Sequence, residues 1–302
     1  MGNVSKILTQ KKDHLMSKNN LMKIPFSYMT IVLIFLACQP ELDIDPEAYQ
    51  QKIVVDGWIE NDLNAHVNLT YSSPYTGATD SAALRKLVIS TAKVTLFDGT
   101  NTEVLILRRD ETLFPPVFYQ SHTIKGEIGK TYELTVYLHG DTITASTTIP
   151  EPPEMTKLWL EPDAEADTMG VLKVDFTDPI ETVDFYRFET KERSSEEGFR
   201  PVWLPNYSDK TFNGEQVLLT LYKGKDNPLA SKQEFLFHLN KPLTVKVSRI
   251  DEGAFEFWDS YEDEVLNGKN PFASSNRSVK HNVEGALGIW CGYGAYYYLV
   301  TY

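Results

Sequence analysis

The fold class is indicated most clearly by Val94-Thr95-Leu96-Phe97-Asp98-Gly99-Thr100-Asn101-Thr102-Glu103-Val104-Leu105-Ile106-Leu107. Apolar and β-branched residues dominate both ends of this stretch, and Asp98-Gly99 lies between them. An Asp-Gly pair accepts the positive φ that a tight hairpin turn requires. The stretch therefore predicts two antiparallel strands, 94–97 and 103–107, joined by a short turn.

Segments with a similar pattern surround this hairpin. Residues 52–60 are rich in β-branched residues, and residues 66–71 alternate polar with apolar residues, as half-buried strands do. Further strands are expected at 132–138 and 142–149, on either side of a turn. About seven short strands separated by turns are typical of a β-sandwich. We therefore expect an N-terminal sandwich-like domain over residues 51–149.

A boundary is indicated by Pro150-Glu151-Pro152-Pro153-Glu154. Such a stretch cannot enter a central strand and favours an extended, stiff connector. We expect a linker at 150–156 and a C-terminal β-rich domain over 157–302, in which Asp251 caps a helix at 251–266. The predicted fold is mainly β: two β-sandwich-like (immunoglobulin-like) domains with one helix in the C-terminal half.

The N-terminal sequence is typical of a secretion signal. Residues 23–38 combine a basic start with an apolar run that is shorter than the ~20 residues needed to span a bilayer. A run of roughly 7–15 apolar residues is typical of a signal peptide. Because Cys38 directly follows Ala37, we expect a bacterial lipoprotein whose signal peptide is 1–37 and whose Cys38 thiol is acylated. The alternative is a plain signal or N-terminal anchor with an incidental Cys38, and Met22 offers a start that would exclude residues 1–21.

The charge of the predicted mature chain is strongly negative. Removing residues 1–37 takes the chain from 29 basic and 42 acidic residues to 24 and 41, which changes the net charge from −13 to −17. This charge repels phosphate backbones, so nucleic acid is not expected as a partner. Residues 38–50 contain two prolines and several acids, which predicts an extended acidic tether; a surface-export signal and a plain polar linker both fit it.

The pattern of polar residues in the sequence predicts no catalytic, cofactor or metal site. The six His form no zinc-type pair, and no Gly-x-Ser-x-Gly motif is present. With Cys38 acylated, Cys291 has no disulfide partner and is expected to be a buried structural thiol. The carboxylates of 163–167 lack the glycine and distal glutamate of a calcium loop, so a solvated loop is favoured. We expect no enzyme, although a site assembled in space from carboxylates leaves no trace in a sequence.

Aromatic side chains are the positive indication of binding. Trp and Tyr combine a large contact area with a polar tip, which suits interfaces and sugar rings. The alternative interpretation is that alternate residues of the last strand face the core. The candidates lie in a long polar loop expected at 194–214 and near the C-terminus: Trp203, Tyr207, Phe212, Tyr293 and Tyr296.

An ordered series of motifs follows the predicted lipidated cysteine and its acidic tether. It comprises Ile53-Val54-Val55-Asp56-Gly57-Trp58-Ile59, Ser73-Pro74-Tyr75, 129–136, Thr148-Ile149-Pro150, 208–214, Asn270-Pro271-Phe272 and 281–288. Over nearly all of the mature chain this series resembles the Bacteroidota lipoproteins grouped as domain of unknown function 4249. The resemblance implies an accessory surface role beside TonB-dependent outer-membrane receptors, and it carries no catalytic residues.

Three functions follow as expectations. The first is an outer-membrane or cell-surface lipoprotein, held in the lipid by acylated Cys38, that acts as a non-catalytic binding accessory to a TonB-dependent receptor. The second is a secreted hydrolase with a carboxylate site assembled in space. The third is a structural or adhesive module of the envelope.

Overall fold

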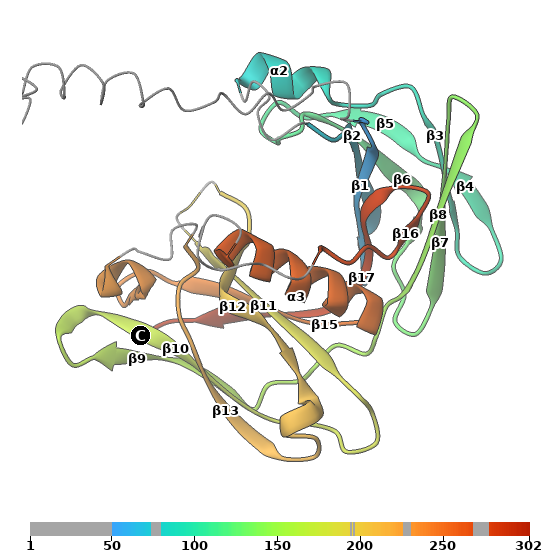
Figure 1. Ribbon diagram of the computed structural model, residues 1–302. Coiled ribbons are helices and arrows are strands. Elements are labelled where there is room, and N and C mark those ends of the chain that lie inside the picture. Colours follow the sequence, from blue (N-terminus) through green and yellow to red (C-terminus); the bar gives the residue numbers. More distant parts are fainter. Residues whose placement is uncertain (1–49, 74–79, 194, 196, 226–230, 268–277) are drawn as a thin grey trace, which may run out of the picture. The chain divides into compact units, whose positions relative to one another are not determined.

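The computed structural model describes residues 50–73, 80–193, 195, 197–225, 231–267 and 278–302 (Figure 1). The predicted signal peptide 1–37, Cys38 and the tether up to residue 49 lie outside these residues. Within them, no helix combines the length and the apolar composition needed to cross a membrane.

The first half of the described chain is built almost entirely of strands. In chain order its elements are β1 (Ile53–Glu60), β2 (Asn64–Tyr71), α2 (Ser81–Lys86), β3 (Lys93–Phe97), β4 (Thr102–Val104), β5 (Ile106–Arg109), β6 (Val117–Lys125), β7 (Thr131–Leu138) and β8 (Asp141–Thr148).

The second half adds further strands and one long helix. Its elements are β9 (Lys157–Asp163), β10 (Ala166–Thr177), β11 (Phe185–Glu192), β12 (Arg200–Ser208), η2 (Asp209–Thr211), β13 (Gln216–Leu221), η3 (Lys232–Phe235), β14 (Phe237–His238), β15 (Leu243–Ile250), α3 (Glu252–Asn267), β16 (Val283–Glu284) and β17 (Leu287–Val300). The expected mainly β, sandwich-like fold is confirmed.

One eight-stranded sheet runs through both halves, in the order β12-β11-β15-β17-β1-β2-β6-β5. The long strand β17 joins them, because its residues 287–293 pair in parallel with β1 and its residues 294–300 pair antiparallel with β15. Strands on both sides of the proline-rich stretch therefore share this sheet. The division into two domains at 150–156 stays a prediction.

Two further sheets complete the architecture, with the orders β16-β8-β7-β3-β4 and β13-β10-β14, and β9 pairs with β10 in the latter. The five-stranded sheet packs with β1 and β2 around a first core that includes Val55, Val67 and Val136. The last sheet packs with β11 and β15 around a second core that includes Phe188, Val174 and Val247. Each half is thus a sandwich that uses its own part of the large sheet.

The connector after β8 crosses β17 where that strand has glycines. A Cβ on Gly294 would lie 2.0 Å from the carbonyl oxygen of Pro150, and one on Gly292 would lie 2.8 Å from that of Thr148. No side chain fits so close to backbone atoms. The glycines of the C-terminal aromatic segment therefore allow this close approach.

Helix α3 lies on the other face of the large sheet and contacts β11, β12 and β17 (Figure 1). Asp251 is its N-cap, as predicted, with Oδ1 accepting a hydrogen bond of 2.8 Å from the amide of Ala254. Ala254 and Phe257 form a third core with Ile289 and Cys291 from β17. The predicted helix is confirmed.

The hairpin after β3 also forms as predicted. Gly99 has a φ of 90°, and Asp98 Oδ1 accepts hydrogen bonds from the amides of Thr100 and Asn101. The expected second strand is divided, however: β4 pairs with β3, whereas β5 pairs with β6 in the large sheet. The chain changes sheets at Leu105, whose side chain is buried in the first core.

The expectation of a long loop at 194–214 is wrong, because β12 and η2 occupy most of its described residues. β12 is the edge strand of the large sheet, where proline's missing donor is tolerated. Pro201 and Pro205 are therefore compatible with this strand, although the polar segment that contains them was predicted to be a loop. The short helix α2 was not predicted.

Candidate functional site

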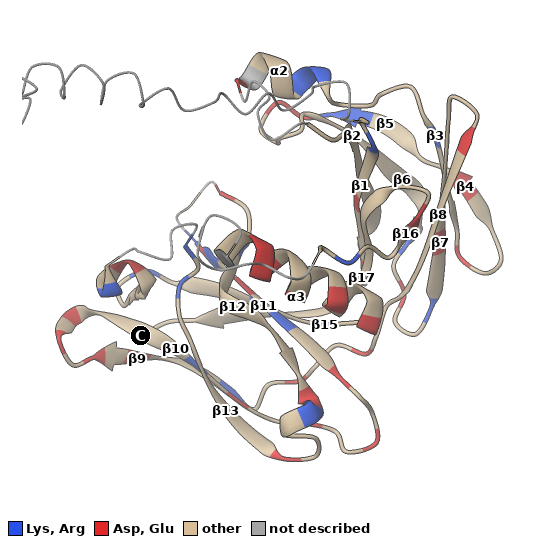
Figure 2. Cartoon of the chain, in the orientation of Figure 1, with Lys and Arg blue, Asp and Glu red and all other residues tan. Residues whose placement is uncertain are grey.

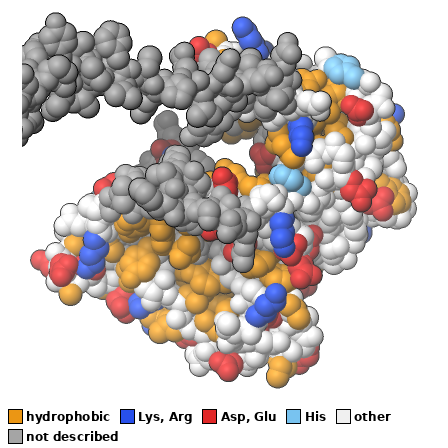
Figure 3. All heavy atoms as spheres, in the orientation of Figure 1, with side chains coloured by type: hydrophobic (Ala, Val, Ile, Leu, Met, Phe, Trp, Pro, Cys, Tyr) orange, Lys and Arg blue, Asp and Glu red, His pale blue; other side chains and the backbone are white. Residues whose placement is uncertain are grey.

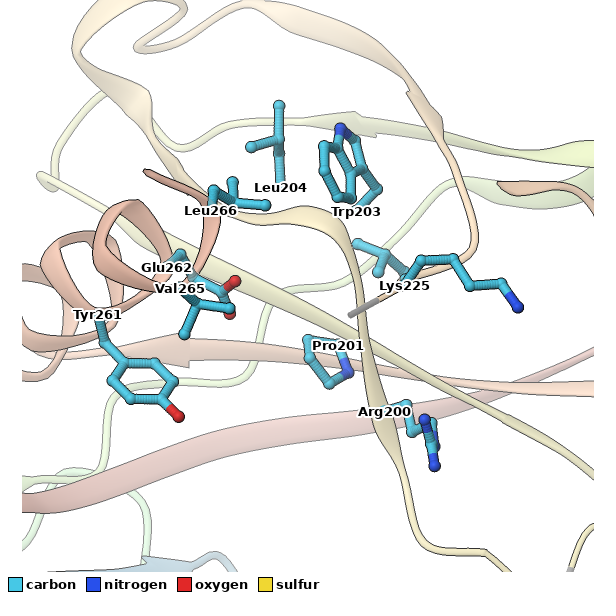
Figure 4. A pocket seen from close by; sticks show the side chains of 11 residues that line it. Arg200, Pro201, Trp203, Leu204, Lys225, Tyr261, Glu262, Val265 and Leu266 are labelled. Carbon is cyan, nitrogen blue, oxygen red and sulfur yellow. The ribbon is translucent and has the colours of Figure 1, made fainter. Parts of the chain in front are cut away.

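Of the five predicted binding residues, Trp203 lies at a groove between β12 and the C-terminal part of α3 (Figure 4). The groove has a volume of about 220 Å³. Trp203 is held at its wall by an edge-on contact with Phe235, with ring centroids 5.0 Å apart.

Apolar side chains of this groove reach solvent. Leu204 is 54% exposed, Tyr261 is 43% exposed and Val265 is 37% exposed. Leu204 has a φ of 53°, an uncommon conformation for a residue with a side chain, so the strand is bent at this point. Figure 3 shows apolar side chains gathered on the visible face of the second half. A groove with such a lining suits a protein or peptide partner.

Tyr207 and Phe212 do not join Trp203 in the groove. Tyr207 packs edge-on against Phe188 with ring centroids 5.6 Å apart, and burial raises the pKa of its hydroxyl. Phe212 packs against Phe176 and Tyr186. Both side chains are half-buried on the second core, so they are not available as the binding surface that was predicted.

Tyr293 and Tyr296 point to opposite faces of β17, because side chains alternate along a strand. Tyr296 is 38% exposed. Tyr293 is buried under α3, where its hydroxyl accepts a hydrogen bond of 3.1 Å from Trp258 Nε1. The Nζ atom of Lys246 lies 4.4 Å from the centre of its ring.

Tyr293 is part of a second pocket, which the sequence did not reveal. This pocket has a volume of about 380 Å³ and lies where β1, β15, β17 and α3 meet. Alternation places Asp56, Trp58 and Glu60 of β1 on its side of the sheet. The alternation along β1 can be recognised in the sequence, but the residues of other elements that complete the pocket cannot. The pocket is lined by Asp56, Gly57, Trp58, Glu60, Leu63, Glu189, Phe199, Lys246, Trp258, Ile289, Tyr293 and Tyr297.

Lys246 is the charged centre of this second pocket. Its Nζ lies 2.7 Å from Glu60 and 3.5 Å from Glu189, and the hydroxyl of Tyr297 donates to Glu60. Burial acts to lower the pKa of Lys246, but the charges of Glu189 and Glu60 outweigh it and raise that pKa. The ammonium therefore stays protonated at neutral pH although it is almost completely buried.

A second cation, Arg187, lies behind the pocket. Its guanidinium carbon is 4.0 Å from the ring centre of Trp258, and its Nη1 donates a 2.7 Å hydrogen bond to Asn206. Glu189 and Glu262 are each 3.9 Å away, which is too far for a hydrogen bond. Arg187 Nε and the neighbouring Ser248 Oγ are buried and make no hydrogen bond within the described part of the chain.

A third group could hold a metal ion. Asp178, Asp184 and Asp209 are buried, and each offers an oxygen within 4.8 Å of the other two. Asp178 accepts hydrogen bonds from Tyr186 and the amide of Gly214, and Asp209 accepts one from the amide of Asp184.

These three carboxylates already have protein partners. Arg249 Nε lies 3.1 Å from Asp184, and burial raises the pKa of the Asp184 carboxyl. A guanidinium at this place neutralises charge that a metal ion would otherwise balance. The observed contacts join β11, η2 and the segment between β10 and β11.

A comparison with protein-family models matches residues 40–296 to a family described as a domain of unknown function (DUF4249). A search of curated proteins finds no match.

Proposed function

The chain belongs to the DUF4249 family, and from this premise we propose that it is a lipid-anchored, non-catalytic binding accessory of the outer membrane or cell surface. Its mature form starts at Cys38, which carries the lipid. Its partner is a TonB-dependent receptor in the same membrane. A lipid anchor followed by the 38–50 tether raises the effective concentration of the protein at such a partner without a large interface.

The Trp203 groove carries this proposal. Leu204, Tyr261 and Val265 expose apolar surface beside Trp203, and the helix and strand that carry them are both fixed to the sheet. Aromatic and aliphatic side chains at the centre of a patch supply most of the binding energy in protein interfaces. A rigid groove loses little conformational entropy when it binds.

The test is co-purification from membranes. Tagged full-length protein is isolated in mild detergent from cells that express the receptor of the same organism. Changing Trp203→Ala or Leu204→Ser should reduce receptor recovery several-fold. Leu218→Ser is the matched control, because Leu218 is 58% exposed but lies on β13, outside the groove. Undiminished recovery with both groove variants would show that the groove is not the contact surface.

The anchor is tested separately. Cys38→Ser should move the protein from the membrane fraction to the soluble fraction after cell breakage. Mass spectrometry of the wild-type mature protein should find acyl chains on Cys38. A bare thiol at that position would contradict the lipoprotein part of the proposal.

A hydrolase is the second candidate, because Glu60 and Glu189 line one pocket. The Nζ atom of Lys246 lies between them, 2.7 Å from Glu60 and 3.5 Å from Glu189. In glycosidase-type hydrolysis the two carboxyl groups flank the scissile bond of the substrate. Because Lys246 already occupies the space between this pair, the pair is less suited to catalysis than to binding. An envelope module without a ligand remains the third candidate; loss of the gene without an uptake defect would favour it.

A further inference from the structure

The second pocket, between β1, β15, β17 and α3, has aromatic walls that already hold cations. Its rings belong to Trp58, Phe199, Trp258, Tyr293 and Tyr297. Arg187 lies over Trp258, and Lys246 lies over Tyr293. The faces of aromatic rings attract positive charge, most strongly where water is excluded. The volume of about 380 Å³ falls within the range of small-molecule sites.

The charges of this pocket do not balance. Three carboxylates, those of Asp56, Glu60 and Glu189, line it together with one cation, Lys246. Behind it, Glu262 and Arg187 add one charge of each sign. Only Glu60 has a cation at hydrogen-bonding distance, because Glu189 and Glu262 lie 3.5–3.9 Å from their partners. The surplus is two negative charges. Glu189, whose side chain is only 15% exposed, lacks a cation at hydrogen-bonding distance, which is unfavourable for a largely buried charge.

The surroundings add to this negative potential. Helix α3 carries six acidic residues and no basic residue in its sequence EGAFEFWDSYEDEVLN. Figure 2 shows these acidic segments along the helix, next to the sheet that forms the pocket floor. Burial and the nearby charge of Glu189 raise the pKa of Glu262 against the effect of Arg187, as expected where carboxylates outnumber cations. Such a field attracts cations and repels anions.

We propose that this pocket binds a small organic cation, with an alkylammonium or guanidinium head group next to Asp56 and Glu189 and its alkyl part against Trp58 and Tyr297. The head group would balance the surplus carboxylates, and the rings would cover its apolar part. This goes beyond the proposed receptor contact, because it uses none of the exposed side chains of the Trp203 groove.

The experiment compares a cation with its neutral isostere. Full-length protein in detergent is titrated by calorimetry with choline, with agmatine and with 3,3-dimethylbutan-1-ol, which has the shape of choline but no charge. At least one of the two cations should bind at least tenfold more tightly than the neutral alcohol. Maltotriose is included because aromatic pockets also accept sugars.

Variants connect the binding to the pocket. Asp56→Asn and Glu189→Gln each remove one charge while keeping the shape, and each should weaken cation binding about tenfold. Glu111→Gln is the matched control, because this exposed carboxylate pairs with Arg109 in the first half and does not line the pocket. Asp56 is exposed, so its variant tests the proposal even where Glu189→Gln unfolds the protein.

Three results would overturn the proposal. One is equal affinity for choline, agmatine and the neutral alcohol. Another is the absence of binding of either cation up to tens of millimolar. The third is binding of maltotriose that Asp56→Asn weakens while neither cation competes, which would assign the pocket to sugars.

Discussion

The hydroxyl of Thr147 donates a hydrogen bond to the carboxylate of Asp251, and this contact joins the last strand of the first half to the helix of the second. Thr147 Oγ1 also accepts a 2.8 Å hydrogen bond from the amide of Gly292 in β17. Asp251 Oδ1, the other oxygen of the carboxylate, caps α3. The Thr147–Asp251 pair therefore stabilises a helix end and joins β8, β17 and α3.

Replacing Asp251 should therefore cost more than losing a helix cap. Loss of an N-cap costs about 1 kcal/mol, and an unsatisfied buried partner costs a further ~1–3 kcal/mol. We expect Asp251→Ala to lower the free energy of unfolding by about 2–4 kcal/mol in urea denaturation. Asp80→Ala is the matched control, since Asp80 caps α2 at an exposed position and should cost only the first amount. Equal losses in the two variants would disprove the bridging role.

The first half should depend on the last strand for its folding. Trp290 of β17 is fully buried in the first core, and its Nε1 donates a 3.0 Å hydrogen bond to the carbonyl of Tyr132. We expect Trp290→Ala to lower the free energy of unfolding by ~3–5 kcal/mol in urea denaturation, because it leaves a large cavity.

The same dependence can be tested with a fragment. Residues 50–156 alone lack Trp290 and the strand that pairs with β1. We expect this fragment to show no cooperative thermal transition by circular dichroism. A sharp transition would establish the first half as an autonomous domain, in agreement with the predicted boundary at 150–156.

The thiol of Cys291 should be inert in the folded protein. It is fully buried beneath α3, and burial raises the pKa of this thiol well above its usual value. The thiolate is the reactive form, so a folded sample at pH 8 should not react at Cys291. The chain has two cysteines, so a mature protein acylated at Cys38 should give no rapid reaction with a disulfide reagent and one equivalent after denaturation. One rapid equivalent would show that Cys38 is bare.

Stability should fall as the pH falls below neutral. Burial lowers the pKa of His66 from its usual 6.5, against the opposing effects of Asn68 and Asp56. The unfolded state then takes up the proton first as the pH falls, so the contribution is complete above pH 6.5 and is lost below it.

The variant His66→Phe isolates this effect. Phe keeps a ring between Trp58 and Phe118, which stack on His66. The slope of the unfolding free energy between pH 7.5 and 5.5 should decrease in the variant. Part of the slope should remain, because burial also lowers the pKa of His281. An unchanged slope would mean that His66 is not a source of the pH dependence.

Local sequence signals were sufficient where neighbours in the chain determine the structure. The Asp98-Gly99 turn, the Asp251 cap and the alternation in β2 depend only on residues within a few positions of one another. The prediction was wrong for β12. A polar segment that contains prolines is typical of a loop, and only the strand order shows that β12 is an edge strand, where prolines are tolerated. The change of sheet at Leu105 could not be predicted for the same reason, because it depends on the pairing of β4 with β3 and of β5 with β6.

The candidate sites divide in the same way. Trp203 was found as an aromatic residue in a polar segment, whereas Tyr207 and Phe212 fitted the same pattern and pack on the core. The pocket around Lys246 was missed, because its charged residues come from β1, β11 and β15 and are far apart in the chain. Only their pairing across the sheet brings them together.

The sequence by itself determined that the chain is mainly β, where its long helix begins and which side chains of a strand share a face, since these properties follow from backbone preferences and from the alternation of side chains. The tertiary structure alone decided that β17 lies between β1 and β15, that both sandwiches share one sheet, and that three carboxylates and one ammonium line the pocket beneath α3. Strand pairing between distant residues depends on the packing of the whole core, and no short segment encodes it.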